Sequence, residues 1–280
     1  MFLRGSAADV GGVGHPVAGG DALPGDGAAA RNLMLAVERC HLRVEAVVAT
    51  PYAAGLSTLV DDEADLGVAL IDFGGGSTSV GVFAGGRLAH VDAVAVGGNH
   101  ITMDIARGLT VSVADAERLK TLYGACAASA SDERDSIAVH RVGDDMDHPS
   151  YLPKSELVRI IRPRVEEILE LVRDRLRDAG LGAHAGRRLV LTGGACQLTG
   201  LPALARTIIS DQIRIGRPLG VEGLPESAKS PAFAAAVGLL VYPQVAGIEH
   251  FEPRRHAHHA AGAGEDGYVA RVGRWLRESF

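Results

Sequence analysis

Two apolar runs that each end in a glycine turn constrain the fold of this chain more than any other feature. The first is LIDFGGGST at residues 70–78, and the second is LTGGACQLTGLPALA at residues 191–205, about 120 residues later. The near-continuous apolar character of each run predicts a buried strand. Segments with helical spacing lie between the two runs and after the second one, so the pattern predicts an α/β protein.

The first run carries an acidic residue to the end of its strand. Gly74, Gly75 and Gly76 would let backbone N–H groups approach a phosphate closely, and Asp72 could hold a magnesium ion or its water. The alternative is a tight hairpin whose glycines serve only the turn. This run alone does not separate the two interpretations.

The second run repeats the arrangement. Gly193 and Gly194 lie at the tip of a strand, and a helix that begins near Pro202 follows. A glycine turn beside a helix start is a place where flat rings and phosphates can lie against the backbone. The two runs in this order, with an alanine-rich helix behind them, are more specific than either run alone.

Hydrophobic spacing and turn residues predict the remaining elements. Order is expected from about residue 32, and residues 124–150 are polar with little periodicity. The expected strands cover residues 42–50, 66–73, 77–83, 87–96, 187–192 and 214–218. The expected helices cover residues 32–40, 51–60, 99–108, 113–123, 155–180 (with Ser155 as its cap), 201–209 and 231–242.

Charge and cysteine content exclude several classes of protein. A formal net charge of -6 argues against a nucleic-acid partner. The three cysteines, Cys40, Cys126 and Cys196, are too few and too scattered for a disulfide framework or a zinc site, so a reducing cytoplasm fits. Cys126 and Cys196 are expected to be small buried side chains rather than nucleophiles. His256, His258 and His259 are expected to belong to a solvated spacer rather than to a metal site.

These motifs resemble those of the actin-like ATPase superfamily, which has a ribonuclease H-like fold. LIDFGGGST resembles its second phosphate motif, VLTGGACQLTGLPAL its adenosine motif, and AERLK at residues 116–120 the segment that contacts ribose and base. Within the superfamily the chain is most similar to the FtsA family of bacterial cell division proteins. VAVGGNHITMDIARGL, SPAFAAAVGLLVYP and the terminal VGRWLRESF carry that similarity.

The resemblance implies an ATP site with magnesium at Asp72, held through water. It also implies an adaptor rather than an enzyme, with no catalytic residue, in which ATP regulates self-association into filaments. The implied cofactor-binding residues are Asp72, Gly74, Gly75, Gly76, Ser77, Thr78, Glu117, Lys120, Gly193 and Gly194. The implied partners are the carboxyl-terminal peptide of FtsZ and the inner face of the cytoplasmic membrane at the division septum.

The chain departs from the family at its beginning. No strand with an Asp-x-Gly pattern precedes residue 70, so we expect a complete second lobe with only a remnant of the first, and weakened ATP binding. The expected division is a disordered or misassigned start at 1–31, a first-lobe remnant at 32–62, the second-lobe core at 63–99 and 153–251, its small subdomain at 100–152, a flexible linker at 252–266 and an amphipathic helix at 267–280.

Two surfaces are candidates for partner binding. Arg159, Arg162 and Arg164 could dock an acidic peptide, although a solvated helix face is the more common role for such charges. In the terminal helix the apolar side chains fall on one arc, which predicts a helix lying on an anionic membrane surface; docking on its own domain is the alternative. The membrane-facing residues are Val269, Val272, Trp275, Leu276 and Phe280.

Two rival functions use the same fold. A phosphotransferase or phosphohydrolase would need a general base and a pocket between two lobes. A pilus-assembly adaptor would bind a partner's peptide. Neither would need the terminal amphipathic helix.

Overall fold

A five-stranded mixed sheet is the centre of the computed structural model, which describes residues 27–127, 129, 132–143, 149–181 and 188–245. The strands lie in the order β3-β2-β1-β6-β7. Neighbours are antiparallel between β1, β2 and β3, and parallel between β1, β6 and β7. The strands are β1 (Val68–Phe73), β2 (Thr78–Ala84), β3 (Arg87–Val94), β6 (Arg188–Thr192) and β7 (Gln212–Ile215).

The pattern of burial explains why the strands take these places. Every residue of β1 is buried, because β1 is central and both faces of the sheet are covered. The edge strand β3 instead mixes buried and exposed positions. β1, β2 and β3 form an antiparallel meander with the glycine turn at its first corner, as the expected strands at 66–73, 77–83 and 87–96 allow.

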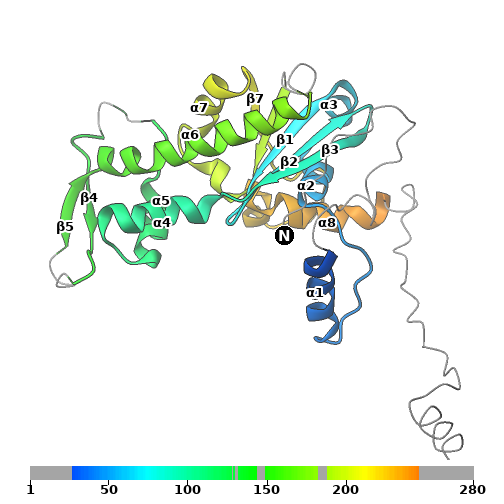
Figure 1. The fold of residues 1–280 in the computed structure, drawn as a ribbon, viewed down its shortest axis with the longest axis horizontal. Coiled ribbons are helices and arrows are strands. Elements are labelled where there is room, and N and C mark those ends of the chain that lie inside the picture. Colours follow the sequence, from blue (N-terminus) through cyan, green and yellow to red (C-terminus); the bar gives the residue numbers. More distant parts are fainter. Residues whose placement is uncertain (1–26, 128, 130–131, 144–148, 182–187, 246–280) are drawn as a thin grey trace, which may run out of the picture.

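Helices cover both faces of the sheet (Figure 1). On one face α2 (Thr50–Thr58) and α8 (Ala234–Val245) pack against each other and against the sheet, around a core that includes Leu70 and Phe83. On the other face α6 (Lys154–Asp178) and α7 (Leu201–Ile208) enclose a larger core that includes Ile71. These two cores confirm the predicted α/β architecture.

A smaller unit extends from one end of the sheet (Figure 1). It consists of α4 (Gly98–Leu109), α5 (Val113–Tyr123), and a hairpin of β4 (Ser136–Val139) and β5 (Ser150–Pro153). The long helix α6 starts beside this hairpin and continues over the sheet, so it belongs to both parts. These elements occupy the segment expected to form the small subdomain, whose boundaries stay a prediction.

Two expectations are wrong, and one expected strand is displaced. Residues 42–50 form no strand, because none of the described residues pairs with them; α2 begins at Thr50. Ser155 does not cap α6, since the helix already begins at Lys154 after Pro153. The strand expected at 214–218 lies at 212–215, where it can pair with β6.

The structure also contains elements that the sequence did not predict, and one helix that starts earlier than expected. Helix α1 (Gly27–Glu38) begins before the expected start of order at residue 32. The acidic segment Asp61–Leu66 forms a short helix, α3, and the polar stretch after α5 contains the hairpin. Within the described ranges no helix is both long and apolar enough to cross a membrane. The expected linker at 252–266, its histidines and the helix at 267–280 lie outside the described residues.

Candidate functional site

The glycine loop between β1 and β2 is tied to the first turn of α4. The N–H of Gly98 donates to the carbonyl of Gly74 at 2.9 Å, and the N–H of Asn99 donates to the carbonyl of Gly75 at 2.8 Å. A Cβ atom at Gly97 would lie only 2.6 Å from the Gly74 oxygen, so only glycine permits this approach. Among the described residues, the N–H groups of Gly75 and Gly76 have no hydrogen-bond acceptor. The loop therefore offers two free amide donors, as a phosphate site requires.

Asp72 lies at the end of β1, beside this loop. Its residue is 8% exposed, and burial raises the pKa of the carboxyl from 3.8 to about 6. No described residue donates a hydrogen bond to its carboxylate or forms an ion pair with it. A buried carboxylate without a partner fits a cation held nearby, because a positive charge would favour the ionised form.

One carboxylate suits a magnesium ion that keeps most of its water. Among the described residues, no group of three or more histidine, cysteine or acidic side chains could hold a metal ion directly. Magnesium at this position would therefore be bound through water and through a ligand's own phosphates. The role expected for Asp72 stays a prediction.

The second glycine turn lies beside Asp72. Gly193 has a φ of 87°, and a Cβ atom there would lie 2.3 Å from Asp72 Oδ1. The hydroxyl of Thr192 is within hydrogen-bond distance of the carbonyls of Gly216 (3.2 Å) and Pro231 (3.1 Å), which fixes the end of β6. The parallel pairing of β1 with β6 thus brings the two predicted motifs together at one edge of the sheet.

The short helix η1 (Gly194–Gln197) continues the second motif toward α4. A Cβ atom at Gly98 would lie 3.3 Å from the Cβ of Ala195, so the two segments are in contact. The first turn of α4 therefore touches both the glycine loop and the second motif. Ser77 and Thr78 lead from the loop into β2, and the buried hydroxyl of Thr78 donates to the carbonyl of Val96 at 2.9 Å.

Lys120 and Glu117 meet on α5, facing α4. The ammonium of Lys120 donates to the carbonyl of Gly98 (3.1 Å), to Thr102 Oγ1 (2.8 Å) and to Glu117 Oε2 (2.7 Å). Burial opposes the charge of Glu117, but hydrogen bonds from Lys120 and Thr102 outweigh it and lower the pKa of this carboxyl. Glu117 thus remains ionised, and its half-exposed side chain could accept hydrogen bonds from the hydroxyl groups of a ribose.

Thr102 is a member of this cluster that the sequence did not indicate. It is 3% exposed, and its hydroxyl donates to Glu117 Oε2 at 2.5 Å. The sequence shows only that Thr102 lies four residues after Gly98 and so on the same face of the helix. That signal gives no role without the tertiary contact between α4 and α5.

Each arginine of the cluster on α6 has an acidic partner within the chain. Arg159 pairs with Glu156 at 2.5 Å and Arg162 with Glu166 at 2.7 Å, both on the helix surface. Arg164 lies deeper and bridges Glu167 and Asp104 of α4. These pairs are compatible with a solvated face, and an acidic peptide would have to displace them. The docking role of Arg159, Arg162 and Arg164 stays a prediction.

Cys126 and Cys196 are both buried. Burial raises the pKa of each thiol to about 12. Neither side chain is therefore a thiolate near neutral pH. Their expected role as small buried side chains is confirmed.

The chain is similar in sequence to known cell division proteins. A family model described as "Cell division protein FtsA" matches residues 69–238. The cell division protein FtsA of Rhizobium meliloti (strain 1021) is 53% identical over 259 residues, which cover 90% of this chain and 57% of that protein. FtsA of Escherichia coli (strain K12) is 35% identical over 258 residues, covering 90% of this chain and 60% of that protein.

The fold is similar to that of solved actin-like ATPases. The crystal structure of MreB5 of Spiroplasma citri bound to ADP superimposes with a TM-score of 0.62 at 17% sequence identity, covering 79% of this chain and 67% of that one. The chain spans 57% to 60% of the length of the two FtsA relatives above. From the family match, the sequence identity and the shared fold together, we conclude that this chain belongs to the FtsA family of cell division proteins.

Proposed function

We propose that this chain acts as an adaptor in bacterial cell division. In this proposal it binds the carboxyl-terminal peptide of FtsZ and holds FtsZ filaments at the inner face of the cytoplasmic membrane, at the septum. The identity of 53% to an FtsA protein over 90% of this chain is the observation that carries the proposal. Self-association into filaments would present many copies together, so that weak contacts add up.

Nucleotide would regulate this adaptor through the paired glycine motifs. The free amides of Gly75 and Gly76 would receive phosphate oxygens, and Asp72 would face magnesium-bound water. Glu117, which accepts a hydrogen bond from Lys120, would also accept hydrogen bonds from ribose hydroxyl groups. These residues would supply one side of a nucleotide site. We expect no catalytic role for any of them.

The small subdomain and the start of α6 would form the FtsZ surface. Arg159 and Arg162 are exposed and lie next to each other on α6, so they could exchange their internal partners for an acidic peptide. The membrane contact would come from Trp275 and its apolar neighbours in 267–280. A single short amphipathic helix binds lipid only marginally, which is why assembly matters here.

Recruitment of FtsZ to vesicles tests both contacts. Vesicles rich in anionic lipid are sedimented with FtsZ, in the presence and absence of this chain. We expect FtsZ in the pellet only when the chain is present. Trp275→Glu should leave both proteins in the supernatant, whereas Arg159→Glu with Arg162→Glu should leave only FtsZ there.

A matched control is Arg173→Glu with Arg177→Glu, which places the same charge change further along α6. It should recruit FtsZ like the unmodified chain. If the chain ignores anionic vesicles, or if Trp275→Glu binds them equally well, the membrane role is wrong. If the double substitution on α6 retains FtsZ fully, those arginines are a solvated face.

An enzymatic role is the second candidate, because the actin-like fold is shared with ATPases. A phosphotransferase or phosphohydrolase needs a base positioned against a bound substrate. The described residues of the site offer only Asp72 and Glu117 as carboxylates, and Glu117 is held by Lys120. Phosphate release from ATP that Asp72→Asn abolishes would favour this candidate over the adaptor.

A further inference from the structure

Helix α8 is apolar on every side. Residues 231–245 carry no charged side chain. A helix of this kind is normally enclosed by protein. One side of α8 packs against α2 and the sheet, where Ala234 and Tyr242 are buried. The opposite side is open, because no residue in the described part of the chain encloses Leu239 and Leu240, which are 50% and 62% exposed.

The exposed side chains of α8 form one continuous surface. At about 100° per residue, Ala236, Leu239, Leu240 and Pro243 fall within an arc of about 100°, and all four are exposed. Phe233, which is 44% exposed, directly precedes the helix. We call these five residues the α8 stripe. Contiguous exposed apolar side chains, unlike scattered ones, mark an interaction site.

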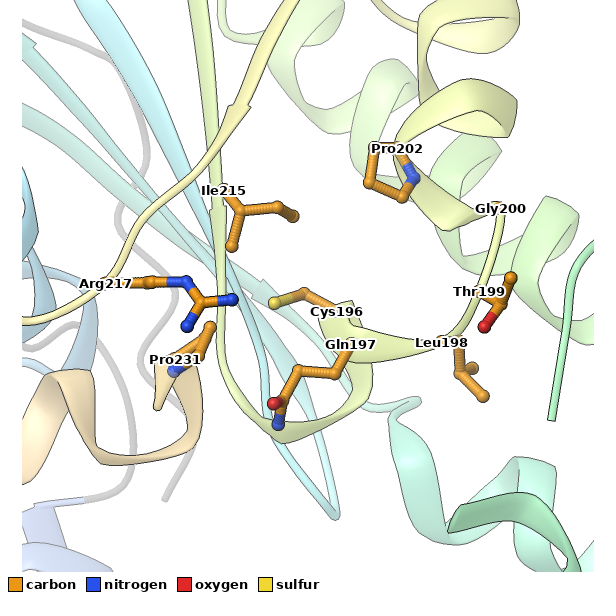
Figure 2. Close-up of a pocket in the computed structure, with 9 residues that line it drawn as sticks. All are labelled: Cys196, Gln197, Leu198, Thr199, Gly200, Pro202, Ile215, Arg217 and Pro231. Carbon is orange, nitrogen blue, oxygen red and sulfur yellow. The ribbon is translucent and has the colours of Figure 1, made fainter. Parts of the chain in front are cut away.

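The α8 stripe lies on a firmly held helix and apart from the candidate nucleotide site. The carbonyl of Pro231, just before α8, accepts from the N–H of Gly193 at 3.1 Å. Pro231 also lines the hollow beside Cys196 of the second motif, whereas no residue of the stripe does (Figure 2). A Cβ atom at Gly238 would lie 1.6 Å from the oxygen of Ala53, so α8 crosses α2 at the closest approach that glycine allows.

A segment of this chain that could cover the stripe follows α8 in the sequence. Residues 267–280 are predicted to form a helix whose apolar side chains fall on one arc, and about 20 residues separate this segment from α8. A coil of that length has a root-mean-square span of about 25 Å, whereas the stripe is about 15 Å long. Residues 246–266 are therefore long enough to bring the segment back to α8, at an effective concentration of about 1 mM.

The chemistry of the two surfaces matches. Trp275 and Phe280 belong to the apolar arc, and Arg271, Arg274 and Arg277 belong to the opposite side. An amphipathic helix that lays its apolar side on an uncharged stripe keeps its arginines in water and buries no unpaired charge. The other long segment outside the described residues, 1–26, is mainly glycine, alanine, aspartate and proline and has no apolar period. It offers no comparable surface.

We infer that residues 267–280 dock on the α8 stripe when the chain is not on a membrane. The same apolar side chains cannot face α8 and lipid at once, so docking and membrane binding exclude each other. Docking therefore lowers the affinity of the free chain for lipid by the fraction of time that the segment is docked. This consequence rests on the proposed membrane role, whereas the docking itself does not.

Trp275 reports on the docking directly, because it is the single tryptophan of the chain. Its fluorescence is measured without lipid, FtsZ or nucleotide. We expect emission at a shorter wavelength, and weaker quenching by acrylamide, than in the same chain unfolded in urea. Leu239→Gln with Leu240→Gln should move the emission to longer wavelength and increase the quenching, because the stripe becomes polar. Glutamine suits exposed helical positions, so the fold should be retained, which circular dichroism checks.

A matched control makes the same change on another helix. Val113→Gln with Leu122→Gln replaces two apolar residues of α5 that are 54% and 61% exposed, and it should leave the fluorescence of Trp275 unchanged. On vesicles rich in anionic lipid, the double substitution on α8 should bind about fivefold more tightly than the unmodified chain, as expected if the segment is free about one-fifth of the time. Neither double substitution alters the charge, so attraction to the lipid is the same in all three proteins.

Four results would overturn the inference. The first is a Trp275 as exposed in the folded chain as in urea, and the second is an equal response of Trp275 to the two double substitutions. The third is an emission that changes with protein concentration, which would make a second copy of the chain the occupant of the stripe. The fourth is an unchanged vesicle affinity of the α8 variant, which would show that docking and lipid binding do not compete. A chain that ignores vesicles altogether would instead refute the proposed membrane role, and the fluorescence would still decide whether the segment docks.

Discussion

Replacing Asp72 with asparagine should stabilise the chain at neutral pH. Burial raises the pKa of this carboxyl from 3.8 to about 6, so the folded state holds the proton more tightly than the unfolded state does. The contribution of this carboxyl to folding stability is therefore fully present below about pH 4 and is lost as pH rises through about 6. At about 1.36 kcal/mol per pH unit, the loss by pH 7.5 is about 3 kcal/mol. The residue is only 8% exposed, so solvent screening reduces this figure little.

Asparagine keeps the shape of the side chain but does not ionise. We expect Asp72→Asn to be more stable than the unmodified chain by about 3 kcal/mol at pH 7.5 and by about half of that at pH 5. Urea unfolding followed by circular dichroism at the two pH values measures this difference. Asp211→Asn, at an exposed position outside the site, is the matched control.

The dependence on pH is the decisive result. An Asp72→Asn variant that is no more stable than the unmodified chain at pH 7.5 would show that the ionised carboxylate has a partner in the folded state. A gain of the same size at both pH values would show that it arises from packing rather than from ionisation. Either outcome would refute the argument that the ionised carboxylate has no partner in the folded chain and is therefore available to a cation.

Three further predictions follow from the contacts. Gly97→Ala should lose about 1–3 kcal/mol of unfolding free energy in urea, because its Cβ would overlap the glycine loop, whereas Gly76→Ala, with no atom within 4 Å, should be nearly neutral. Arg164→Gln should lose about 1–2 kcal/mol in the same assay because it joins α6 to α4, against less than about 0.5 kcal/mol for the exposed Arg162→Gln. Iodoacetamide at pH 8 should alkylate only Cys40 in the folded chain, and a second modified cysteine seen by mass spectrometry before unfolding would contradict the burial of the others.

The central strands were predictable from the sequence because their burial leaves a direct trace. An apolar run such as residues 66–73 has few alternatives to a buried strand, and the glycines that follow it mark the turn. Helix α5 was also placed at its observed bounds of Val113–Tyr123, since Asp115 and Glu117 mark its first turns.

Residues 42–50 show the limit of this reasoning. Their β-branched side chains have the propensity of a strand, but a strand also needs a hydrogen-bonding neighbour. The described part of the chain offers none there. The hairpin of β4 and β5 was missed for the opposite reason: each strand is only 4 residues long, too short to show a period.

The glycines of the candidate site could be predicted from the sequence, but the contacts that join its segments could not. The motifs gave Gly74–Gly76 and Gly193, because their spacing along the chain carries the signal. The contacts of Gly97 with the loop and of Thr102 with Lys120 depend on how α4 approaches β1 and α5. No local pattern encodes such an approach.

The place in the chain of the smaller unit, formed by α4, α5, β4 and β5, bears on the order of folding. β1 pairs with β2 across a short turn, but it pairs with β6 only after the chain has left the sheet and returned, as at Ala69 and Leu189. Closing a loop of that length is entropically unfavourable, so the β1–β6 ladder is expected to form late. Prior folding of α4, α5 and α6 would shorten the loop, since α6 carries the chain back over the sheet. Substitutions that weaken this smaller unit should therefore slow the completion of the sheet, far from the residues that were changed.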